Sequence, residues 1–409
     1  MIVAGDLARR IVFKALGGLR GGEVVLRHPD GRGRRFGDGL GPRVIVDLHR
    51  TDDFWRKLAL RTRVGFGESY VDGDWDADDL VAFFELLSRN LDRLAGNAWV
   101  ARLHRAQRLR PDRSLRQTLD AARESIHAHY DLGNDLFRLM LDPTMTYSCA
   151  YWERPDMTLE EAQIAKDRAV CDKLHLGPDD HVLEIGCGWG GFAMYAAEEH
   201  GCRVTGVTIS REQAELARER VRTAGLEDLV EIREQDYRQV EGSFSRIVSI
   251  EMLEAIGQAE HETYFTSVDR LLAPGGISLV QTIAVPDERF ERYRRSPDWI
   301  QQYVFPGSLI PSLHAISTAL ARSRLMIVGL EEIGVGYADT IRAWRANIDA
   351  SNDRVRALGY DERFLRIWRF YLSYCEAAFR VRHLRDMQLV LSRALNDALP
   401  LYPRQRVTF

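Results

Sequence analysis

At 409 residues the chain is longer than one hydrophobic core usually supports, so two domains are expected. Its 45% hydrophobic and 28% charged residues are typical of a globular protein, and a net charge of −4 gives no indication of a nucleic-acid partner. The five cysteines are scattered and form no CxxC pair, which favours reduced thiols over a disulfide or zinc framework. No apolar run reaches the roughly 18 residues that a membrane span needs. The first 18 residues do not resemble a secretory signal, so a cytoplasmic location is expected.

Residues 1–92 form the first compositional unit. Short alternating segments at 23–26 and 44–48 predict strands, and Gly/Arg-rich turns separate them. A helical pattern follows, with Asp76 as its expected N-cap. This predicts a small α+β domain without a catalytic constellation, which would serve lipid or membrane contact or packing.

Residues 93–125 form a basic helical linker between the two domains. Its central stretch contains a single acid, Asp112, among six arginines: Arg102, Arg105, Arg108, Arg110, Arg113 and Arg116. One interpretation is a solvated connector. The other is a surface for anionic lipid headgroups, where each cation contributes about 1 kcal/mol.

Residues 126–409 show the pattern of an α/β domain. Thr158 and Glu161 form a capping box that opens a helix over 159–175. Five short apolar runs then alternate with helical patterns, which predicts a parallel sheet covered on both faces. Ligands of such sheets bind at the carboxyl ends of the strands.

A glycine-rich loop follows the first of these runs, in Leu183–Gly191. Its G-x-G-x-x-G spacing would also suit a dinucleotide, because glycines let the backbone approach a ligand closely. Glu184, two residues before the first glycine, is instead typical of methyltransferase loops. A dinucleotide fold would also have an acid at the end of the second strand, where this chain has Thr208.

Five sequence blocks follow one another along the chain: HYDLGNDLF (129–137), TYSCAYW (146–152), LEIGCGWGG (183–191), GVTISREQ (206–213) and QDYR (235–238). In residues and order they match cyclopropane fatty acid synthases, and the chain resembles that family over roughly residues 125–395. The resemblance implies an α/β fold: a Rossmann-like class I methyltransferase sheet with a smaller N-terminal α+β domain. It also implies S-adenosylmethionine as cofactor and the double bond of a phospholipid acyl chain as substrate.

The resemblance assigns cofactor contacts residue by residue. It implies that Gly186 and Gly188, after Glu184, contact the methionine part and that Thr208 and Gln213 lie near the ribose. Gln235 and Asp236 are expected near the adenine, and Tyr147 and Ser148 over the bound cofactor.

Methyl transfer to an alkene leaves a carbocation, which needs shielding from water and a base for one proton. In the family the base is a bicarbonate ion held by a cysteine backbone, a glutamate, a histidine and a tyrosine. The matching positions are Cys149, Glu254 and Tyr337, and Cys375 matches a further active-site cysteine. Gln281 replaces the histidine. Its amide can bind an anion but carries no positive charge, which weakens the expectation of bicarbonate.

Glu251 is a second departure, because the family has a small residue there. A carboxylate near Glu254 would repel a bound anion, and it could itself be the base. The alternative is a structural pairing with an arginine.

These departures resemble a subgroup that forms 10-methylene fatty acids, which a separate flavoprotein reductase saturates to 10-methyl products. We therefore predict a methylene product over a cyclopropane ring. A small-molecule N- or O-methyltransferase and a non-catalytic lipid carrier are the other hypotheses. We expect peripheral association with the inner face of the membrane, while the oligomeric state, including a homodimer, stays open.

Overall fold

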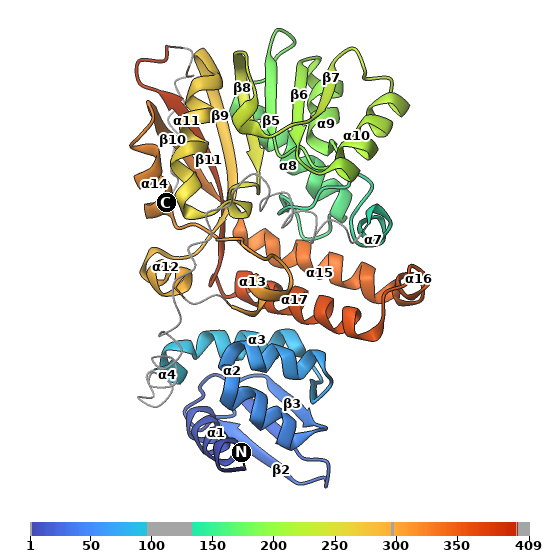
Figure 1. Ribbon diagram of the computed structural model, residues 1–409, viewed down its shortest axis with the longest axis vertical. Helices are drawn as coiled ribbons and strands as arrows, with labels where there is room; N and C mark the ends of the chain where they lie inside the picture. The colour runs from blue at the N-terminus through green and yellow to red at the C-terminus, as the bar shows by residue number, and fades with distance from the viewer. Residues whose placement is uncertain (1, 96–132, 296–297, 398, 400–409) are drawn as a thin grey trace. The chain divides into compact units, whose positions relative to one another are not determined.

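The computed structural model describes residues 2–95, 133–295, 298–397 and 399. Contacts divide the chain into two compact units (Figure 1). Among the described residues, unit one combines 2–95 with Glu288–Gly307 and Gly334–Arg385. Unit two combines 133–287 with Ser308–Ile333 and the strand residues from Asp386. The predicted division into 1–92, 93–125 and 126–409 stays a prediction, because the linker lies almost wholly outside the described residues.

Unit one begins with a small mixed sheet in the order β2-β1-β3-β4, formed by β1 (Glu23–Arg27), β2 (Gly33–Gly37), β3 (Arg43–Leu48) and β4 (Trp75–Ala77). The two predicted strand segments are confirmed as β1 and β3. Its helices are α1 (Ile2–Leu16), α2 (Thr51–Val71), α3 (Leu80–Arg89) and α4 (Leu91–Ala95). The predicted cap of α3 is wrong. The side chain of Asp79 accepts from the N–H of Ala82 at 2.9 Å, while Asp76 lies in β4 and pairs there with β3.

Helices from the second half of the chain complete unit one: α12 (Asp287–Arg294), α13 (Trp299–Tyr303), α15 (Gly334–Ala350), α16 (Asn352–Ala357) and α17 (Glu362–Arg380). The ring of Phe370 in α17 lies 5.1 Å from that of Phe84 in α3 and 4.7 Å from that of Trp299. The aromatic stripe of α17 is therefore part of the core of unit one.

Unit two contains a seven-stranded sheet in the order β10-β11-β9-β8-β5-β6-β7. Its strands are β5 (His181–Ile185), β6 (Arg203–Thr208), β7 (Val230–Glu234), β8 (Phe244–Ile250), β9 (Leu272–Ala284), β10 (Leu325–Glu332) and β11 (Arg385–Arg393). The five predicted apolar runs are β5 to β9, and their neighbours pair in parallel. The predicted α/β parallel architecture is therefore confirmed.

Helices cover both faces of this sheet (Figure 1). The helices α8 (Leu159–Leu174), α9 (Gly191–His200) and α10 (Arg211–Thr223) bury apolar side chains against one face. The other face packs against α11 (His261–Leu271) and α14 (Leu313–Leu320). A further helix, α7 (Asn134–Met140), precedes them, and short 3-10 helices η1 (Tyr237–Gln239), η2 (Leu253–Ala255) and η3 (Gln258–Glu260) lie in the loops.

The predicted capping box of α8 is confirmed. The hydroxyl of Thr158 accepts from the N–H of Glu161 at 3.2 Å, and the Glu161 carboxylate accepts from the N–H of Thr158 at 2.7 Å. This fixes the start of the helix that carries Lys166 and Lys173 toward the sheet.

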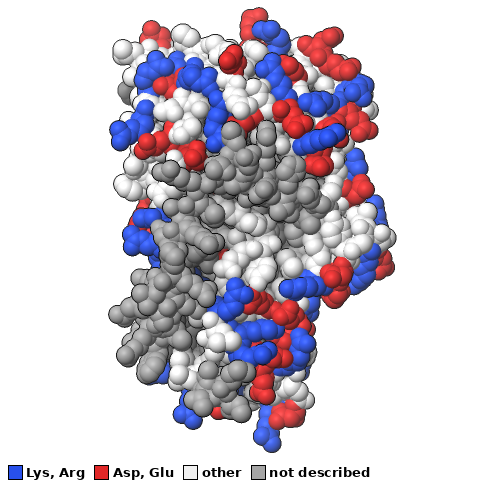
Figure 2. Space-filling view, viewed as in Figure 1, with Lys and Arg blue, Asp and Glu red and all other residues white. Residues whose placement is uncertain are grey.

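The surface charges and helix lengths bear on membrane contact. On the face shown in Figure 2, basic and acidic residues of the described chain are interspersed. Within the described ranges, no helix combines the length and apolar character needed to cross a membrane.

Candidate active site

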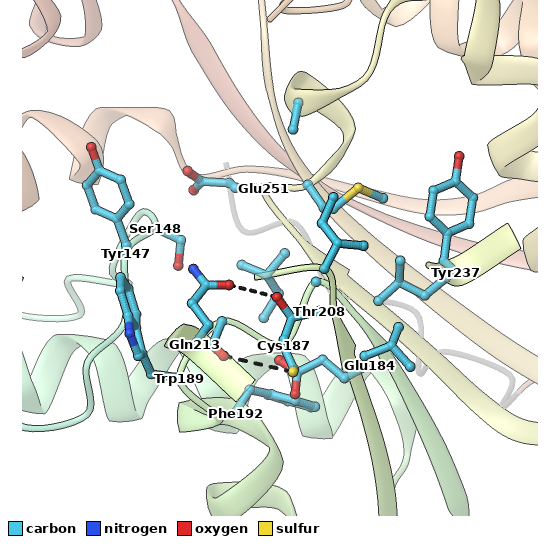
Figure 3. A pocket seen from close by; sticks show the side chains of 18 of the residues that line it. Tyr147, Ser148, Glu184, Cys187, Trp189, Phe192, Thr208, Gln213, Tyr237 and Glu251 are labelled. Atoms are coloured by element: carbon cyan, nitrogen blue, oxygen red, sulfur yellow. Dashed lines mark hydrogen bonds between the residues drawn. The ribbon is translucent and has the colours of Figure 1, made fainter. Parts of the chain in front are cut away.

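A cavity opens in unit two where the loops after β5, β6, β7 and β8 meet (Figure 3). This is the carboxyl end of the parallel strands, where ligands of such sheets bind. The structure brings together here all the residues for which the sequence predicted cofactor contact: Tyr147, Ser148, Glu184, Gly186, Gly188, Thr208, Gln213, Gln235 and Asp236. Glu251 lines the same cavity.

Glycine is required at two points of the cavity wall. Gly186 has φ +83°, and a Cβ there would lie 2.9 Å from Cγ of Met252. At Gly191 a Cβ would lie 2.7 Å from the carbonyl oxygen of Thr144. The β5–α9 loop can therefore approach a ligand and its neighbouring loop only because these side chains are missing.

Three of the residues predicted to contact the cofactor are held by hydrogen bonds within the protein. The Thr208 hydroxyl donates to Oε1 of Gln213 at 2.8 Å (Figure 3), so the amide nitrogen is the end of Gln213 that remains as a donor. Asp236 caps η1 by accepting from the N–H of Arg238 at 2.9 Å, and its carboxylate also pairs with the Arg238 guanidinium at 2.7 Å. These bonds preorganise the cavity wall.

Three buried charged residues, Glu184, Lys166 and Asp167, lie beside the glycine loop. Burial raises the pKa of Glu184 to about 8, with a further contribution from Asp167, while the ammonium of Lys166 opposes the rise. Lys166 Nζ lies 3.0 Å from Asp167 Oδ1 and donates to the Ser148 hydroxyl at 3.4 Å. Oε2 of Glu184 is buried with no hydrogen-bond partner among the described residues. An α-amino-acid group, with one ammonium and one carboxylate, fits this environment.

Sequence reasoning missed Lys166. The available signal was a lysine on the inward face of the predicted helix 159–175, where its ammonium could not be solvated.

The predicted catalytic residues of unit two meet around the carboxylate of Glu251. Its Oε1 accepts from the N–H of Cys149 at 2.7 Å and from Nε2 of Gln281 at 3.0 Å. Ile250 pairs with Gln281 in the β8–β9 register, and the N–H of Glu251 donates to the Gln281 carbonyl at 2.8 Å. Figure 3 shows the carboxylate on the Ser148 side of the cavity. Glu251 is thus held at the cavity wall through both its backbone and its side chain.

Glu254 follows Glu251 by three residues and lies on η2. Its Oε1 accepts from the Thr282 hydroxyl at 3.0 Å and from the N–H of Ile283. Burial, together with the nearby charge of Glu251, raises the pKa of Glu254 to about 8. Its Oε2 is buried without a hydrogen-bond partner in the described part of the chain. Glu254 is therefore a poor place for a permanent negative charge.

Asp386, in β11, is a third carboxyl that sequence reasoning missed. It is fully buried, and its Oδ2 accepts from Nε2 of Gln281 at 3.0 Å. Burial and the charges of Glu251 and Glu254 raise the pKa of Asp386 well above its usual range, and a hydrogen bond to Glu251 adds to the rise. Glu251 and Asp386 both accept from the same amide nitrogen of Gln281, and they are called the carboxyl pair below.

The site does not fit a bicarbonate ion. Two of the donors that the family resemblance assigns to the anion are the Cys149 backbone N–H and the side chain at position 281. Both donate to Oε1 of Glu251. The Glu251 carboxylate therefore takes up these two hydrogen bonds, which a bound anion would need.

Tyr337 and Cys375 belong to unit one. The ring centroid of Tyr337 lies 4.4 Å from that of Phe379, and the side chain is buried. Burial raises the pKa of the Cys375 thiol far above its usual range, so it is a neutral thiol at physiological pH. Their catalytic roles remain predictions. Across the residues that the structure describes, no group of three His, Cys, Asp or Glu side chains could hold a metal ion.

Comparisons with known proteins bear on this site. The family model described as mycolic acid cyclopropane synthetase matches residues 117–389. A tuberculostearic acid methyltransferase from Mycobacterium tuberculosis, UfaA1, is 38% identical over 90% of this chain and 87% of its own length. The cyclopropane-fatty-acyl-phospholipid synthase of Escherichia coli is 39% identical over 89% of this chain and 92% of its own.

The chain also resembles a solved structure of a cyclopropane synthase. The mycolic acid cyclopropane synthase CmaA1, in complex with SAH and CTAB, superposes with a TM-score of 0.61. It is 34% identical, and the match covers 66% of this chain and 97% of that one. The match confirms the predicted fold class, because the sheet of unit two is shared with an S-adenosyl cofactor-binding synthase.

Proposed function

Because the chain belongs to the mycolic acid cyclopropane synthetase family, we propose that it methylates the cis double bond of an unsaturated phospholipid acyl chain and forms a methylene-branched product. At the level of the family, the chain is an S-adenosylmethionine-dependent methyltransferase that acts on fatty acyl lipids. The methylene product and the roles of individual residues are the finer parts of the proposal.

The cavity residues account for cofactor binding. S-adenosylmethionine, when bound, supplies an electrophilic methyl group. Glu184 and Lys166 would receive the amino and carboxylate groups of its methionine part, and the Gly186 backbone permits their close approach. Thr208 and Gln213 would bind the ribose, and Gln235 and Asp236 the adenine.

The reaction on the lipid needs a base at the cavity wall. The π electrons of the double bond would form a C–C bond to the methyl group while the bond from this methyl group to sulfur breaks and its electron pair stays on the sulfur. The neighbouring carbon would be left as a cation. A hydride shift moves the cation to the carbon that carries the new methyl group. That methyl group then loses a proton, and its C–H electrons form an exocyclic double bond. We assign the proton acceptor to Glu251.

The observation that carries this assignment is the pair of hydrogen bonds from Cys149 and Gln281 to the Glu251 carboxylate. They hold a carboxylate at the cavity wall, where the family resemblance implies a bound anion. A cyclopropane ring is the second candidate product, supported by the similarity to the Escherichia coli enzyme. It shares the first step and differs in where the cation resides when the proton leaves.

The product decides between the two. Purified protein would be incubated with S-adenosylmethionine and dioleoyl-phospholipid vesicles, and the extracted acyl chains analysed by NMR, because the two products have equal mass. Vinylidene proton signals are expected. Cyclopropane signals without vinylidene signals would overturn the methylene branch, and a methyl group on nitrogen or oxygen would overturn the lipid alkene as substrate.

The remaining partners follow from this chemistry. A methylene product would be consumed by a flavoprotein reductase that saturates the new double bond. Because the substrate is part of a membrane, we also propose peripheral association with its inner face.

A further inference from the structure

A line of hydrogen-bonded side chains leads from Lys173, which is partly exposed, to the carboxyl pair of Glu251 and Asp386. Lys173 on α8 donates to Oε1 of Gln388 on β11. Nε2 of Gln388 donates to Oε1 of Gln281 on β9 at 3.0 Å. Nε2 of Gln281 then donates to Glu251 and to Asp386, at 3.0 Å each. The two glutamines are 0% exposed, whereas the Lys173 side chain keeps 21% of its surface.

All hydrogen bonds of this line are donated in the same direction, because Lys173, its first member, can only donate. A lysine ammonium has three donors and no acceptor, so Gln388 must turn its oxygen toward Lys173. The nitrogen of Gln388 then faces Gln281, which must present its own oxygen. As a result both N–H groups of Gln281 are available on the side of the carboxyls. A glutamine without such a partner could equally present its oxygen to them.

Lys173 is itself held in place. Its ammonium lies 2.5 Å from Oε2 of Glu331, whose Oε1 accepts from the Tyr151 hydroxyl at 2.7 Å. These contacts hold the lysine near Gln388, and neither Lys173 nor Gln388 belongs to the cavity lining.

We propose that Lys173 and Gln388 are positioning residues, which orient the Gln281 amide so that it donates to the Glu251–Asp386 pair. The inference rests on the proposed role of Glu251 as the base. Other ionisable groups next to this pair are Glu254, the Cys149 thiol and, through Cys149, the ammonium of Lys166. The carboxylate of Glu332 on β10 also accepts from the N–H of Asp386 at 3.3 Å. The side chains of Glu254, Cys149 and Lys166 make no hydrogen bond to Gln388 or Lys173 within the described chain.

The test compares Lys173→Met, Gln388→Met and the double variant with the unmodified protein. Each single change leaves Gln281 free to turn its oxygen toward the carboxyls, which favours their protonated forms. We expect kcat to fall about tenfold, as for loss of one charge-assisted hydrogen bond. The acid limb of the pH–rate profile should move up by about one unit. KM for the lipid and the affinity for S-adenosylmethionine should not change.

Two further results distinguish orientation of the Gln281 amide from a direct effect of the Lys173 charge on the carboxyl pair. The double variant should be no slower than either single variant, because both changes break the same line. Lys173→Arg should restore the rate, since arginine also only donates. Arg168→Met is the matched control, because it removes a cation on the same helix that pairs with Glu153 and not with the line.

Wild-type kcat and pH profile in Lys173→Met and Gln388→Met would overturn the inference, as would losses that add in the double variant. Glu251→Gln measured in the same assay separates this from the proposed function. If Glu251→Gln is slow while both Met variants are normal, only the positioning role fails. If Glu251→Gln turns over at the wild-type rate, the assignment of the base fails.

Discussion

The backbone of Glu251 has a φ of +52°, in the left-handed region that non-glycine residues rarely adopt. Such a conformation costs about 1–2 kcal/mol for a residue with a Cβ. The residue directly follows β8, with its N–H bonded to the Gln281 carbonyl and its carboxylate bonded to Cys149 and Gln281. Unfavourable backbone conformations of this kind cluster at functional sites, which supports the assignment of Glu251 as a functional residue.

Replacing Glu251 by Gln tests this residue with its shape preserved. We expect turnover to fall by about 10²-fold or more, the usual contribution of a general base. The affinity for S-adenosylmethionine, measured by calorimetry, should stay within error of the wild type. A parallel loss of affinity would assign Glu251 to the cofactor cavity rather than to proton transfer.

Glu254 predicts a pH dependence of stability. Its pKa is raised in the folded state from 4.5 to about 8, so between these values the folded protein binds more protons than the unfolded chain. The free energy of unfolding contributed by this group therefore falls as pH rises from about 4.5 to 8. Glu254→Gln should flatten this part of the curve in urea unfolding without cofactor. An unchanged slope would show that Glu254 is ionised throughout.

Single residues also show how far the sequence could be interpreted. Glu251 and Gln281 drew attention because they break a family pattern, and the structure brings them together. Asp386 and Gln388 did not, because they lie in the apolar stretch RDMQLVLSR. Their spacing of two on a buried strand places both on one face of the sheet, and that was the available signal.

At the scale of elements, apolar runs separated by turns were enough to predict β5 to β9 and the loops that build the cavity. The capping box of α8 was predicted from local sequence because its bonds are local. The cap of α3 was not, since Asp76 and Asp79 both precede the helix. Only the pairing of β4 with β3 decides that Asp76 is strand.

The first residue of α9, Gly191, lies close to the loop that contains Thr144, and this contact predicts the effect of a substitution. Alanine at Gly191 would bring a Cβ to 2.7 Å from the Thr144 carbonyl and push away the loop that carries Tyr147 and Ser148. We expect Gly191→Ala to weaken S-adenosylmethionine binding at least tenfold in calorimetry, although alanine is the better helix former. Gly177→Ala is the control, because a Cβ there meets nothing within 4 Å. Equal affinities in the two variants would contradict the role of this contact.

For the whole molecule, the sequence predicted two units but not their composition. Residues 334–385 connect the sheet strands β10 and β11 in sequence, yet they pack with the N-terminal helices. No local pattern reveals this, because it depends on which apolar faces meet. The placement of Tyr337 and Cys375 in unit one follows from the same long-range packing.

Membrane association is tested on the whole chain, because the arginines of the predicted linker lie outside the described residues. We expect co-sedimentation with vesicles containing anionic lipid to decrease between low and physiological salt. Replacing Arg102, Arg105, Arg108, Arg110, Arg113 and Arg116 by glutamine should abolish that dependence. Binding that ignores both lipid charge and salt in the unmodified protein would exclude a headgroup surface.

The position of β11 has a consequence for synthesis on the ribosome. It lies between β9 and β10, although it is the last strand of the described chain. All residues that line the cofactor cavity precede position 257, and the Gln281 bonds that hold Glu251 come from β9, so the cavity wall is complete once β9 has been translated. Until β11 emerges, the edge of β9 stays unpaired, and the site lacks Asp386 and Gln388. A nascent chain could therefore hold its cofactor before it is able to use it.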